Sequence, residues 1–345
     1  MQSLHPHLKR ASWIAFIAGL TVFLFLMIYY GVGDIAAALA VAGVSGLALI
    51  AASHLIPLAS EALGWGFLFE PGRRPAFRTL LWGRWIGEAV DTLLPVAQVG
   101  GNLVRIRLFM KLGWPATLIA ASLVADTTLS VVTLIGFTLL GLVMLTTYVA
   151  ADGVVIPIFL AMLVLGVLIF AFYLAQKRGL FGFLARLLQG LVGPLDAAVV
   201  DGANAIDEQT LDIYARRKDV LFSTFWLAAA WALGTLEVWL ALRLLGHPVG
   251  LFEAFLIESV VQGVRASAFL IPAGLGVQEG GFLLMGAILS LPADVALALA
   301  LTRRVRELVF GIPGLLAWQW FEIRNQWRLR SGTAAKGSES PRNMP

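Results

Sequence analysis

The sequence predicts an all-α polytopic membrane protein, with an inverted repeat and two re-entrant helical hairpins, because of its apolar composition and its long apolar runs. Of its 345 residues, 59% are hydrophobic and 13% are charged, whereas about a quarter of the residues of a soluble domain are charged. Several runs exceed the roughly 18 apolar residues that a bilayer-spanning helix needs. Without cysteine, disulfides, thiol nucleophiles and thiolate metal sites are excluded.

Apolar runs separated by short, basic connections predict about six full spans. The first run follows Lys9 and Arg10 and has no clear cleavage site, so a membrane helix is expected there rather than a cleaved signal. Two other regions, 77–111 and 252–291, each hold two shorter apolar segments broken by proline and glycine, which makes eight spans if these pairs cross. The expected full spans are residues 11–31, 36–69, 116–148, 153–175, 219–245 and 293–321.

The basic residues set the expected orientation. They fall on one side of these spans, and only Arg243 and His247 depart from the pattern. By the positive-inside rule, that side is cytoplasmic and so are both termini. The residues on this side are Lys9, Arg10, Arg73, Arg74, Arg78, Lys111, Lys177, Arg178, Arg186, Arg216, Arg217, Lys218, Arg324, Arg328 and Arg330.

The chain is expected to form a single integral membrane domain over residues 1–330. Residues 176–218 are predicted to be a cytoplasmic, amphipathic connector, because LFGFLARLLQGL places Arg186 among apolar residues, as in a helix that lies in the interface. Residues 331–345 are small, polar and proline-containing, and a disordered tail is predicted there.

An internal repeat is indicated when the sequence is slid by about 177 positions. Three prolines then align without a gap: Pro71 with Pro248, Pro95 with Pro272, and Pro115 with Pro292. Repeat A covers about 36–148 and repeat B about 219–321. Under the expected topology the two copies have opposite orientations. Paired, broken hydrophobic segments in inverted halves indicate a transport site near the membrane midplane.

Each broken region is interpreted as a re-entrant helical hairpin. The arms expected are 84–94 and 99–111 on the cytoplasmic side, and 258–271 and 277–289 on the other side. Polar residues recur on helical faces of these arms and of the last span at spacings of three and four. These faces are Arg84, Glu88 and Asp91; Gln98, Asn102 and Arg105; Glu258, Gln262 and Arg265; and Arg303, Arg306 and Glu307.

The cost of burying these groups leaves two interpretations. One charged residue at the centre of a membrane helix costs about 2.5–3.5 kcal/mol, so the charges must face one another or water. They either form interior ion pairs, such as Arg105 with Glu88 or Arg303 with Glu307, or line a groove for a charged head group. Glu61, Asp126 and Glu237 are further acids in apolar spans, with no partner evident from the sequence. His54 is interpreted as an interior, hydrogen-bonded histidine, and the spacing of the histidines predicts no metal site.

The segments PVAQVGGNLVRIRLFMKLG and IPAGLGVQEGGFLLMGAILSLPADVALALAL resemble the membrane flippase region of the lysylphosphatidylglycerol synthase family, and within it the stand-alone, HpnL-type proteins associated with hopanoid biosynthesis. The resemblance covers about residues 10–325. It implies lipid translocation between leaflets, and the missing cytoplasmic domain after Arg330 implies that this chain does not make lysyl-lipid. It associates these glycine turns and neighbouring residues with the substrate cavity: Gly100, Gly101, Asn102, Arg105, Gly274, Gly276, Glu279 and Gly280.

The function expected is that of a lipid flippase or transporter of a bacterial inner membrane, without cofactor, catalytic residue or nucleic-acid partner. It would move a polar-headed phospholipid or hopanoid-type lipid. Arg105 and Arg265 would bind an anionic or polyol head group, while acids would balance the charge and accept a cationic group or a proton. The substrate-binding residues expected are Glu88, Asp91, Gln98, Gly100, Gly101, Asn102, Arg105, Arg265, Gly274, Gly276, Gln278, Glu279, Gly280 and Arg303.

Two other functions remain open at this point. One is a non-transporting scaffold for enzymes of hopanoid or glycolipid assembly, with a surface for lipid-biosynthesis enzymes. The other is a lipid-modifying enzyme that uses Glu88 or Glu279 as acid or base, although the sequence contains no donor-binding motif. The sequence leaves the lipid, the direction, the energy coupling and the oligomeric state undetermined.

Overall fold

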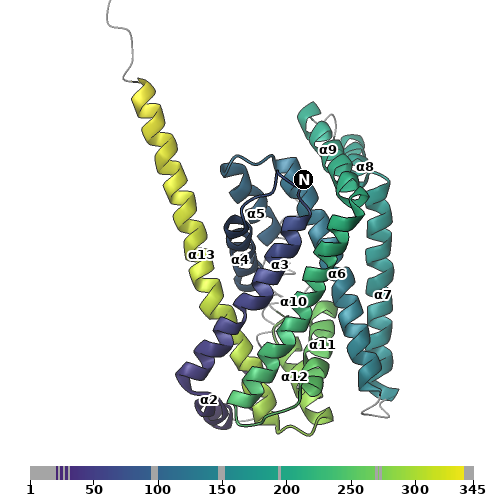
Figure 1. Cartoon of the computed structure of the whole chain (residues 1–345), viewed down its shortest axis with the longest axis vertical. Coiled ribbons are helices and arrows are strands. Elements are labelled where there is room, and N and C mark those ends of the chain that lie inside the picture. The colour runs from purple at the N-terminus through teal and green to yellow at the C-terminus, as the bar shows by residue number, and fades with distance from the viewer. Residues whose placement is uncertain are drawn as a thin grey trace, which may run out of the picture.

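The structure, a computed structural model, is helical throughout its regular elements and contains no strand among the residues it describes (Figure 1). The first expected span, 11–31, lies mostly outside these residues. The described residues are 21, 24–25, 28–29, 32–94, 100–146, 152–192, 196–268, 271 and 274–337.

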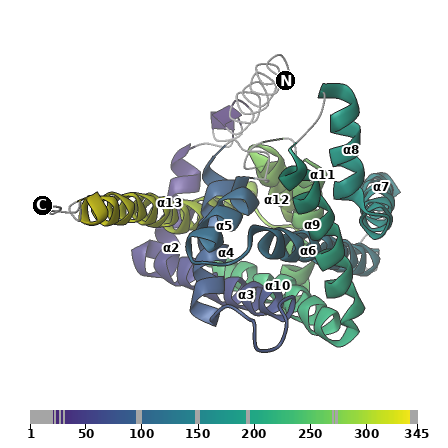
Figure 2. The ribbon, with the colours of Figure 1, turned by 90° about the horizontal axis from the view of Figure 1, so that it is seen from above.

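The helices follow one another with short connections. Their bounds are α2 Val32–Ser53, α3 Leu55–Phe67, α4 Phe77–Leu93, α5 Gly100–Lys111, α6 Ala116–Leu145, α7 Asp152–Lys177, α8 Leu180–Val192, α9 Ala197–Ala215, α10 Arg217–Leu244, α11 Leu251–Ser267, α12 Val277–Ile288 and α13 Ala293–Gly337. Seen from above, α7 and α8 lie on the side opposite the projecting end of α13 (Figure 2).

Three stretches of the described residues are long and apolar enough to cross a membrane: Leu39–Phe67, which covers parts of α2 and α3, Ala116–Leu145 and Arg217–Leu244. A fourth candidate is formed by Gly166–Lys177 and Leu180–Leu187, which are bent by 81°. These helices confirm a helical membrane protein. The count of six or eight spans stays a prediction.

The expected span 36–69 is interrupted rather than continuous. Gly43 has φ 63° inside α2, a left-handed conformation that glycine adopts without strain. The chain breaks again at His54, between α2 and α3, because Pro57 has no N–H to donate to the carbonyl of Ser53. This second break places His54 at a bend inside the bundle.

Each of the two broken regions forms a helix, a break and a second helix, and whether these pairs re-enter or cross the membrane stays a prediction. In the first, α4 ends where Leu94, which precedes Pro95, becomes extended. In the second, Gly274 and Gly276 have φ of 59° and 77°, so the break between α11 and α12 requires glycine. The first arms begin earlier than expected, at Phe77 and Leu251, because helix-compatible residues extend each arm back toward the preceding proline. Figure 1 places α4 and α5 toward one end of the bundle and α11 and α12 toward the other.

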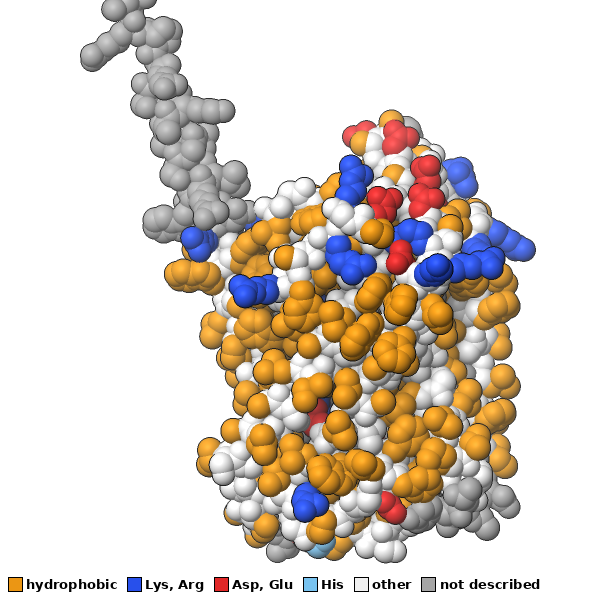
Figure 3. Space-filling model, in the orientation of Figure 1, with side chains coloured by type: hydrophobic (Ala, Val, Ile, Leu, Met, Phe, Trp, Pro, Cys, Tyr) orange, Lys and Arg blue, Asp and Glu red, His pale blue; other side chains and the backbone are white. Residues whose placement is uncertain are grey.

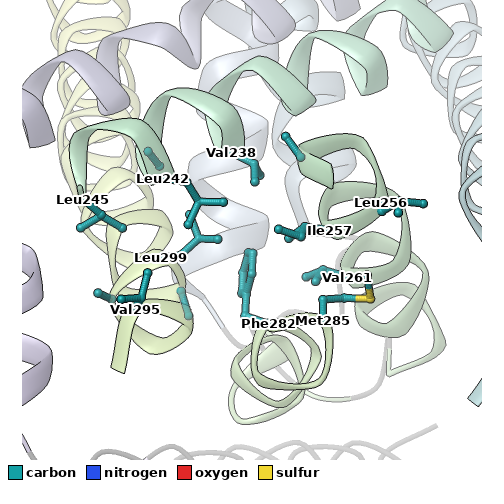
Figure 4. Close-up of a cluster of buried hydrophobic side chains, with 14 of the residues drawn as sticks. Val238, Leu242, Leu245, Leu256, Ile257, Val261, Phe282, Met285, Val295 and Leu299 are labelled. Carbon is teal, nitrogen blue, oxygen red and sulfur yellow. The ribbon is translucent and has the colours of Figure 1, made fainter. Parts of the chain in front are cut away.

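Each hairpin packs into its own apolar core. One core holds Trp65, Phe69 and Phe109 with residues of α4, α5 and α6. The other joins α10, α11, α12 and α13, with Phe282 and Met285 at its centre (Figure 4). The long helices α10 and α13 contribute to both cores, and their buried charged residues lie between the two stretches: Glu237, Arg303, Arg306 and Glu307. The fold therefore places a polar layer between two apolar cores.

The connector 176–218 forms the helices α8 and α9. Asp207 of α9 accepts hydrogen bonds from the backbone N–H groups of Phe181 and Gly182, at 3.0 and 2.7 Å, which caps the start of α8. Phe183 and Leu187 of α8 are exposed, as in a helix that lies in the interface. Figure 3 shows hydrophobic side chains over the middle of one face, with Lys and Arg gathered toward the end that carries α9.

The C-terminal helix extends further than the sequence indicated. A disordered tail was expected from residue 331, but α13 continues to Gly337, and residues 338–345 lie outside the described part of the chain. The sequence TAAK within this extension has good helix formers, which can prolong an existing helix at little cost.

An ion-pair brace connects α5 to α13 beyond the expected end of the last span. Glu322 accepts a hydrogen bond from Arg107 at 2.8 Å and another from Lys111. These bonds lower the pKa of Glu322 from 4.5 to about 2. Arg107 is exposed, with 59% of its side chain accessible.

A Glu322→Gln variant should therefore lose stability in a pH-dependent way. Because the folded pKa is depressed, the carboxylate stabilises the fold above its unfolded pKa of about 4.5, and this contribution disappears as the pH falls toward 2. Such a partly exposed brace contributes about 1 kcal/mol or less. In detergent at pH 7 the variant should unfold at a slightly lower temperature than wild type, and this difference should shrink below about pH 4.5. Glu208→Gln serves as control, because Glu208 is exposed, and a difference in unfolding temperature that is constant between pH 7 and 3 would contradict the assignment.

Candidate functional site

A cavity of about 360 Å³ lies in the polar layer between the two cores. Its wall is formed by α3, α4, α5, α6, α10, α11 and α13, so both halves of the chain contribute. Six carboxylates and four arginines line it, together with one histidine. The ionisable residues in the wall are His54, Glu61, Arg84, Glu88, Asp91, Arg105, Asp126, Glu237, Glu258, Arg265 and Arg306.

Arg84 is the centre of the charge network in the first half. It reaches Glu61 of α3 at 3.0 Å and also bonds Asp126 of α6. Its guanidinium is buried, with 6% of the side chain exposed. The pairing removes the cost of isolated charges at this depth, which would be several kcal/mol each. Arg84 thereby ties the first hairpin to the helices on either side of it.

Arg105 is held less closely than Arg84. Its nearest carboxylate is Asp126, at 4.0 Å, and its Nε has no hydrogen-bond partner within the described part of the chain. The side chain crosses α4 at Gly87, where a Cβ would collide with the guanidinium, so glycine at this position is what admits it. It stacks above Trp65 at 5.8 Å. Arg105 is thus a buried cation, positioned by packing, that retains hydrogen-bonding capacity toward the cavity.

The second half has its own network of paired charges, centred on α13. Arg303 bonds Glu258 of α11, and Arg306 reaches both oxygens of Glu237 on α10 at 2.5 and 2.7 Å. Arg304 bonds Glu279 of α12 at 2.9 Å. These contacts connect α13 to the second hairpin and to α10.

Arg265 of α11 resembles Arg105 in being loosely paired. Its nearest carboxylate, Glu307, is 3.8 Å away, and 21% of its side chain is exposed to the cavity. Gly274 packs against its aliphatic stem, with an ideal Cβ 3.2 Å from Cγ. Each hairpin therefore presents one arginine to the cavity without a close carboxylate.

In each half an ion pair joins the first arm of the broken region to the long helix that follows it, and the two pairs have their charges exchanged. In the first half, Arg84 of the first arm pairs with Asp126 of the following long helix. In the second half, Glu258 of the first arm pairs with Arg303 of the following long helix. Asp126 and Arg303 are 177 positions apart, the offset at which the prolines align. On the first arms the partners differ by three positions, since Glu258 aligns with Leu81, one helical turn before Arg84.

His54 connects the first hairpin to the second half. Its Nε2 lies 2.9 Å from Oε1 of Glu88 on α4, and its Nδ1 faces Oε2 of Glu237 on α10 at 3.5 Å. The ring packs edge-on against Phe310. The expectation of an interior, hydrogen-bonded histidine agrees with this geometry, but both of its neighbours are carboxylates, which the sequence alone did not indicate.

Five of the expected binding residues lie together in the cavity wall. The predicted polar face of α4 is confirmed, because Arg84, Glu88 and Asp91 all line the cavity. Asp91 braces the hairpin by accepting a hydrogen bond from the N–H of Gly101 at 2.8 Å. Gln98 lies outside the described residues. The five residues in the wall are Glu88, Asp91, Asn102, Arg105 and Arg265.

The other expected residues lie behind the wall. Glu279 is fully buried and accepts from the N–H of Gly276 at 2.7 Å, which stabilises the start of α12. Gln278 is also fully buried, and Arg303 is committed to Glu258. The expected residues placed outside the cavity wall are Gly100, Gly101, Gly274, Gly276, Gln278, Glu279, Gly280 and Arg303.

The ion pairs suggested by the sequence are wrong in their partners. Glu88 contacts His54 instead of Arg105, and Glu307 bonds Arg304 at 2.8 Å instead of Arg303. The acids that had no evident partner have one: Arg84 for Glu61 and Asp126, and Arg306 for Glu237. The contribution of Arg304 was missed, because it lies off the face shared by its neighbours.

Comparisons with known proteins agree with the helical membrane architecture. A family model described as the lysylphosphatidylglycerol synthase TM region matches residues 13–314, which include both hairpins and the whole cavity wall. Searches of curated proteins and of solved structures find no match.

Proposed function

The chain belongs to the lysylphosphatidylglycerol synthase TM-region family, and on that premise we propose that it moves a polar-headed lipid between the leaflets of a bacterial inner membrane. A head group cannot cross about 30 Å of hydrocarbon without a polar path. The cavity supplies polar groups between the two apolar cores, and the lipid tail would stay outside in the bilayer. Phospholipids and hopanoid-type lipids are the cargo we consider, the latter in line with the stand-alone, HpnL-type branch.

The observation that carries the proposal is the pair Arg105 and Arg265. They come from different hairpins, line the same cavity, and lie 4.0 and 3.8 Å from their nearest carboxylates. The other lining arginines, Arg84 and Arg306, each have a carboxylate within 3.0 Å. Charge-assisted bonds to an anionic group are therefore available at the two loosely paired arginines. We place the phosphate or another anionic or polyol part of the head group between them.

The mechanism we propose is alternating access between two inverted halves. The order of apolar span, first arm, second arm and long helix occurs twice, with α2 and α3 together as the span before α4 to α6, and α10 as the span before α11 to α13. The aligned positions Asp126 and Arg303, each paired with the first arm of its own half, support the repeat. Rocking of one half against the other about the cavity would expose the head group to each side in turn. The basic end that carries α9 would face the cytoplasm by the positive-inside rule.

Lipid movement in proteoliposomes tests this function. We would follow labelled phosphatidylglycerol, phosphatidylethanolamine and a glycolipid by leaflet-selective quenching, in wild type and in Arg105→Gln and Arg265→Gln. Loss of one charge-assisted contact of about 1.5–3 kcal/mol predicts movement that is slower by about 10- to 100-fold. Arg107→Gln is the matched control, because Arg107 is exposed and lies outside the cavity.

Two outcomes would contradict the proposal in different ways. If wild type moves no lipid faster than empty liposomes, the protein is not a flippase. If wild type moves lipid and both variants match it, the protein moves lipid but its head-group site lies elsewhere.

A further inference from the structure

We propose that His54 is the binding site of a proton that is transported together with the lipid. This inference rests on the proposed function and adds an energy source to it. The site is the bridge formed by Glu88, His54 and Glu237, which joins the first hairpin to α10 across the cavity wall.

The two ring nitrogens of His54 identify the bound proton. Nε2 lies 2.9 Å from one carboxylate oxygen and Nδ1 faces another at 3.5 Å. A carboxylate only accepts hydrogen bonds, and a neutral imidazole carries an N–H on one nitrogen alone. Its second nitrogen would then direct a lone pair at a carboxylate. Nδ1 makes no hydrogen bond at this distance, but only the imidazolium presents an N–H to both carboxylates, so the geometry favours the protonated ring.

The charges around the bridge favour proton binding. Glu61 lies on α3, which begins just after His54. Glu88 faces His54 from α4 and Glu237 from α10, while Arg306 and Glu307 face it from α13. The cavity wall as a whole has six carboxylates and four arginines. The breaks 95–99 and 269–273 contain no ionisable residue that could change this balance. A proton on His54 reduces an excess of negative charge that is costly inside a membrane.

The two carboxylates of the bridge differ in how firmly they are held. Glu237 is fixed by two bonds from Arg306 and 5% of its side chain is exposed. Glu88 has no arginine within ion-pair distance in the described part of the chain, and 35% of its side chain is exposed. Glu88 is therefore the side on which the proton enters and leaves through cavity water. When the proton leaves, the bond to Glu88 is lost and α4 is released from α10.

The coupling is tested by lipid accumulation against an imposed pH gradient. Vesicles of phosphatidylethanolamine and phosphatidylglycerol would carry labelled phosphatidylglycerol, with a difference of one pH unit across the membrane. One proton per lipid predicts an asymmetry of about tenfold between the leaflets at steady state. His54→Gln should abolish the asymmetry, and His247→Gln, in the loop before α11, should leave it unchanged.

The outcomes separate this inference from the function beneath it. If wild type moves lipid but builds no asymmetry, or if His54→Gln still builds one, lipid transport stands and the proton site is wrong. If wild type moves no lipid at all, the proposed function fails and the coupling fails with it. Glu88→Gln is the second variant, which keeps the histidine and should also abolish the asymmetry if His54→Gln does not fold.

Nitrogen NMR of the histidines tests proton binding without transport. The chain has four histidines, so the signal of His54 is assigned as the one missing from His54→Gln. In nanodiscs at pH 7 we expect both of its nitrogens to be protonated in wild type, and one of them to be unprotonated in Glu88→Gln. A neutral His54 ring in wild type at pH 7 would overturn the proposal.

Discussion

A Glu258→Gln variant is expected to be among the least stable single variants of this protein. Glu258 and Arg303 have 2% and 3% of their side chains exposed, and no other ion pair of the described residues is as buried on both sides. Removing the carboxylate leaves the guanidinium charged and buried without its partner. Breaking a buried pair in this way costs about 3–5 kcal/mol, a large part of a typical folding free energy of about 5–15 kcal/mol.

The measurement is the unfolding temperature in detergent or nanodiscs, read from the fraction of protein that stays monodisperse after heating. The double variant Glu258→Gln, Arg303→Gln should recover part of the loss, because it removes both charges, and the cycle gives the coupling free energy of the pair. Arg243→Gln is the control, since Arg243 is exposed at the far end of α10. A single variant as stable as this control would show that Arg303 is not dependent on Glu258.

This result would also decide between two roles for Arg303. The sequence placed it among the substrate-binding residues, and the structure places it behind the cavity wall in a pair with Glu258. If the double variant is folded and still moves lipid, Arg303 contributes to stability and is not needed for transport. If it is folded and inactive, the pair affects transport beyond its contribution to stability.

The breaks and faces of the hairpins could be predicted from local sequence. Proline and glycine end helices for reasons of backbone geometry, so Pro95 and the pair Gly274 and Gly276 mark the breaks wherever the rest of the chain lies. The face of Glu88 and Asp91 follows from helical periodicity alone. Both of these predictions agree with the structure because each depends on only a few consecutive residues.

The ion-pair partners could not be predicted in the same way. Arg84 and Asp126 are 42 residues apart, and Arg306 and Glu237 are 69 apart. Which of them meet depends on how α4, α6, α10 and α13 are rotated and how deeply each is placed. A shift of one residue turns a helical side chain by about 100°, so Arg303, Arg304 and Arg306 reach three different acids from adjacent positions. Sequence periodicity indicated the charged layer and left its pairing open.

A cysteine pair at Thr138 and Gly263 is expected to stop lipid movement when oxidised and to restore it when reduced. Thr138 is on α6 of the first half and Gly263 on α11 of the second, and an ideal Cβ at Gly263 lies 3.4 Å from Cβ of Thr138. Disulfides typically join Cβ atoms about 3.5–4.5 Å apart, so the bond should form in the conformation described here. The natural chain has no cysteine, so no other thiol competes.

The expected loss is large because the cross-link joins the elements that alternating access must separate. The α6–α11 contact is tight, since Gly141 packs against Ser259 and Thr138 donates a hydrogen bond to the carbonyl of Ser259 at 3.1 Å. Rocking of the halves requires this contact to change, and a disulfide of fixed geometry prevents it. Oxidised protein should move lipid at the rate of empty liposomes, while each single-cysteine variant should be insensitive to oxidation. Full activity in completely cross-linked protein would show that the halves do not separate at this contact, and the movement would then have to lie in the hairpins themselves.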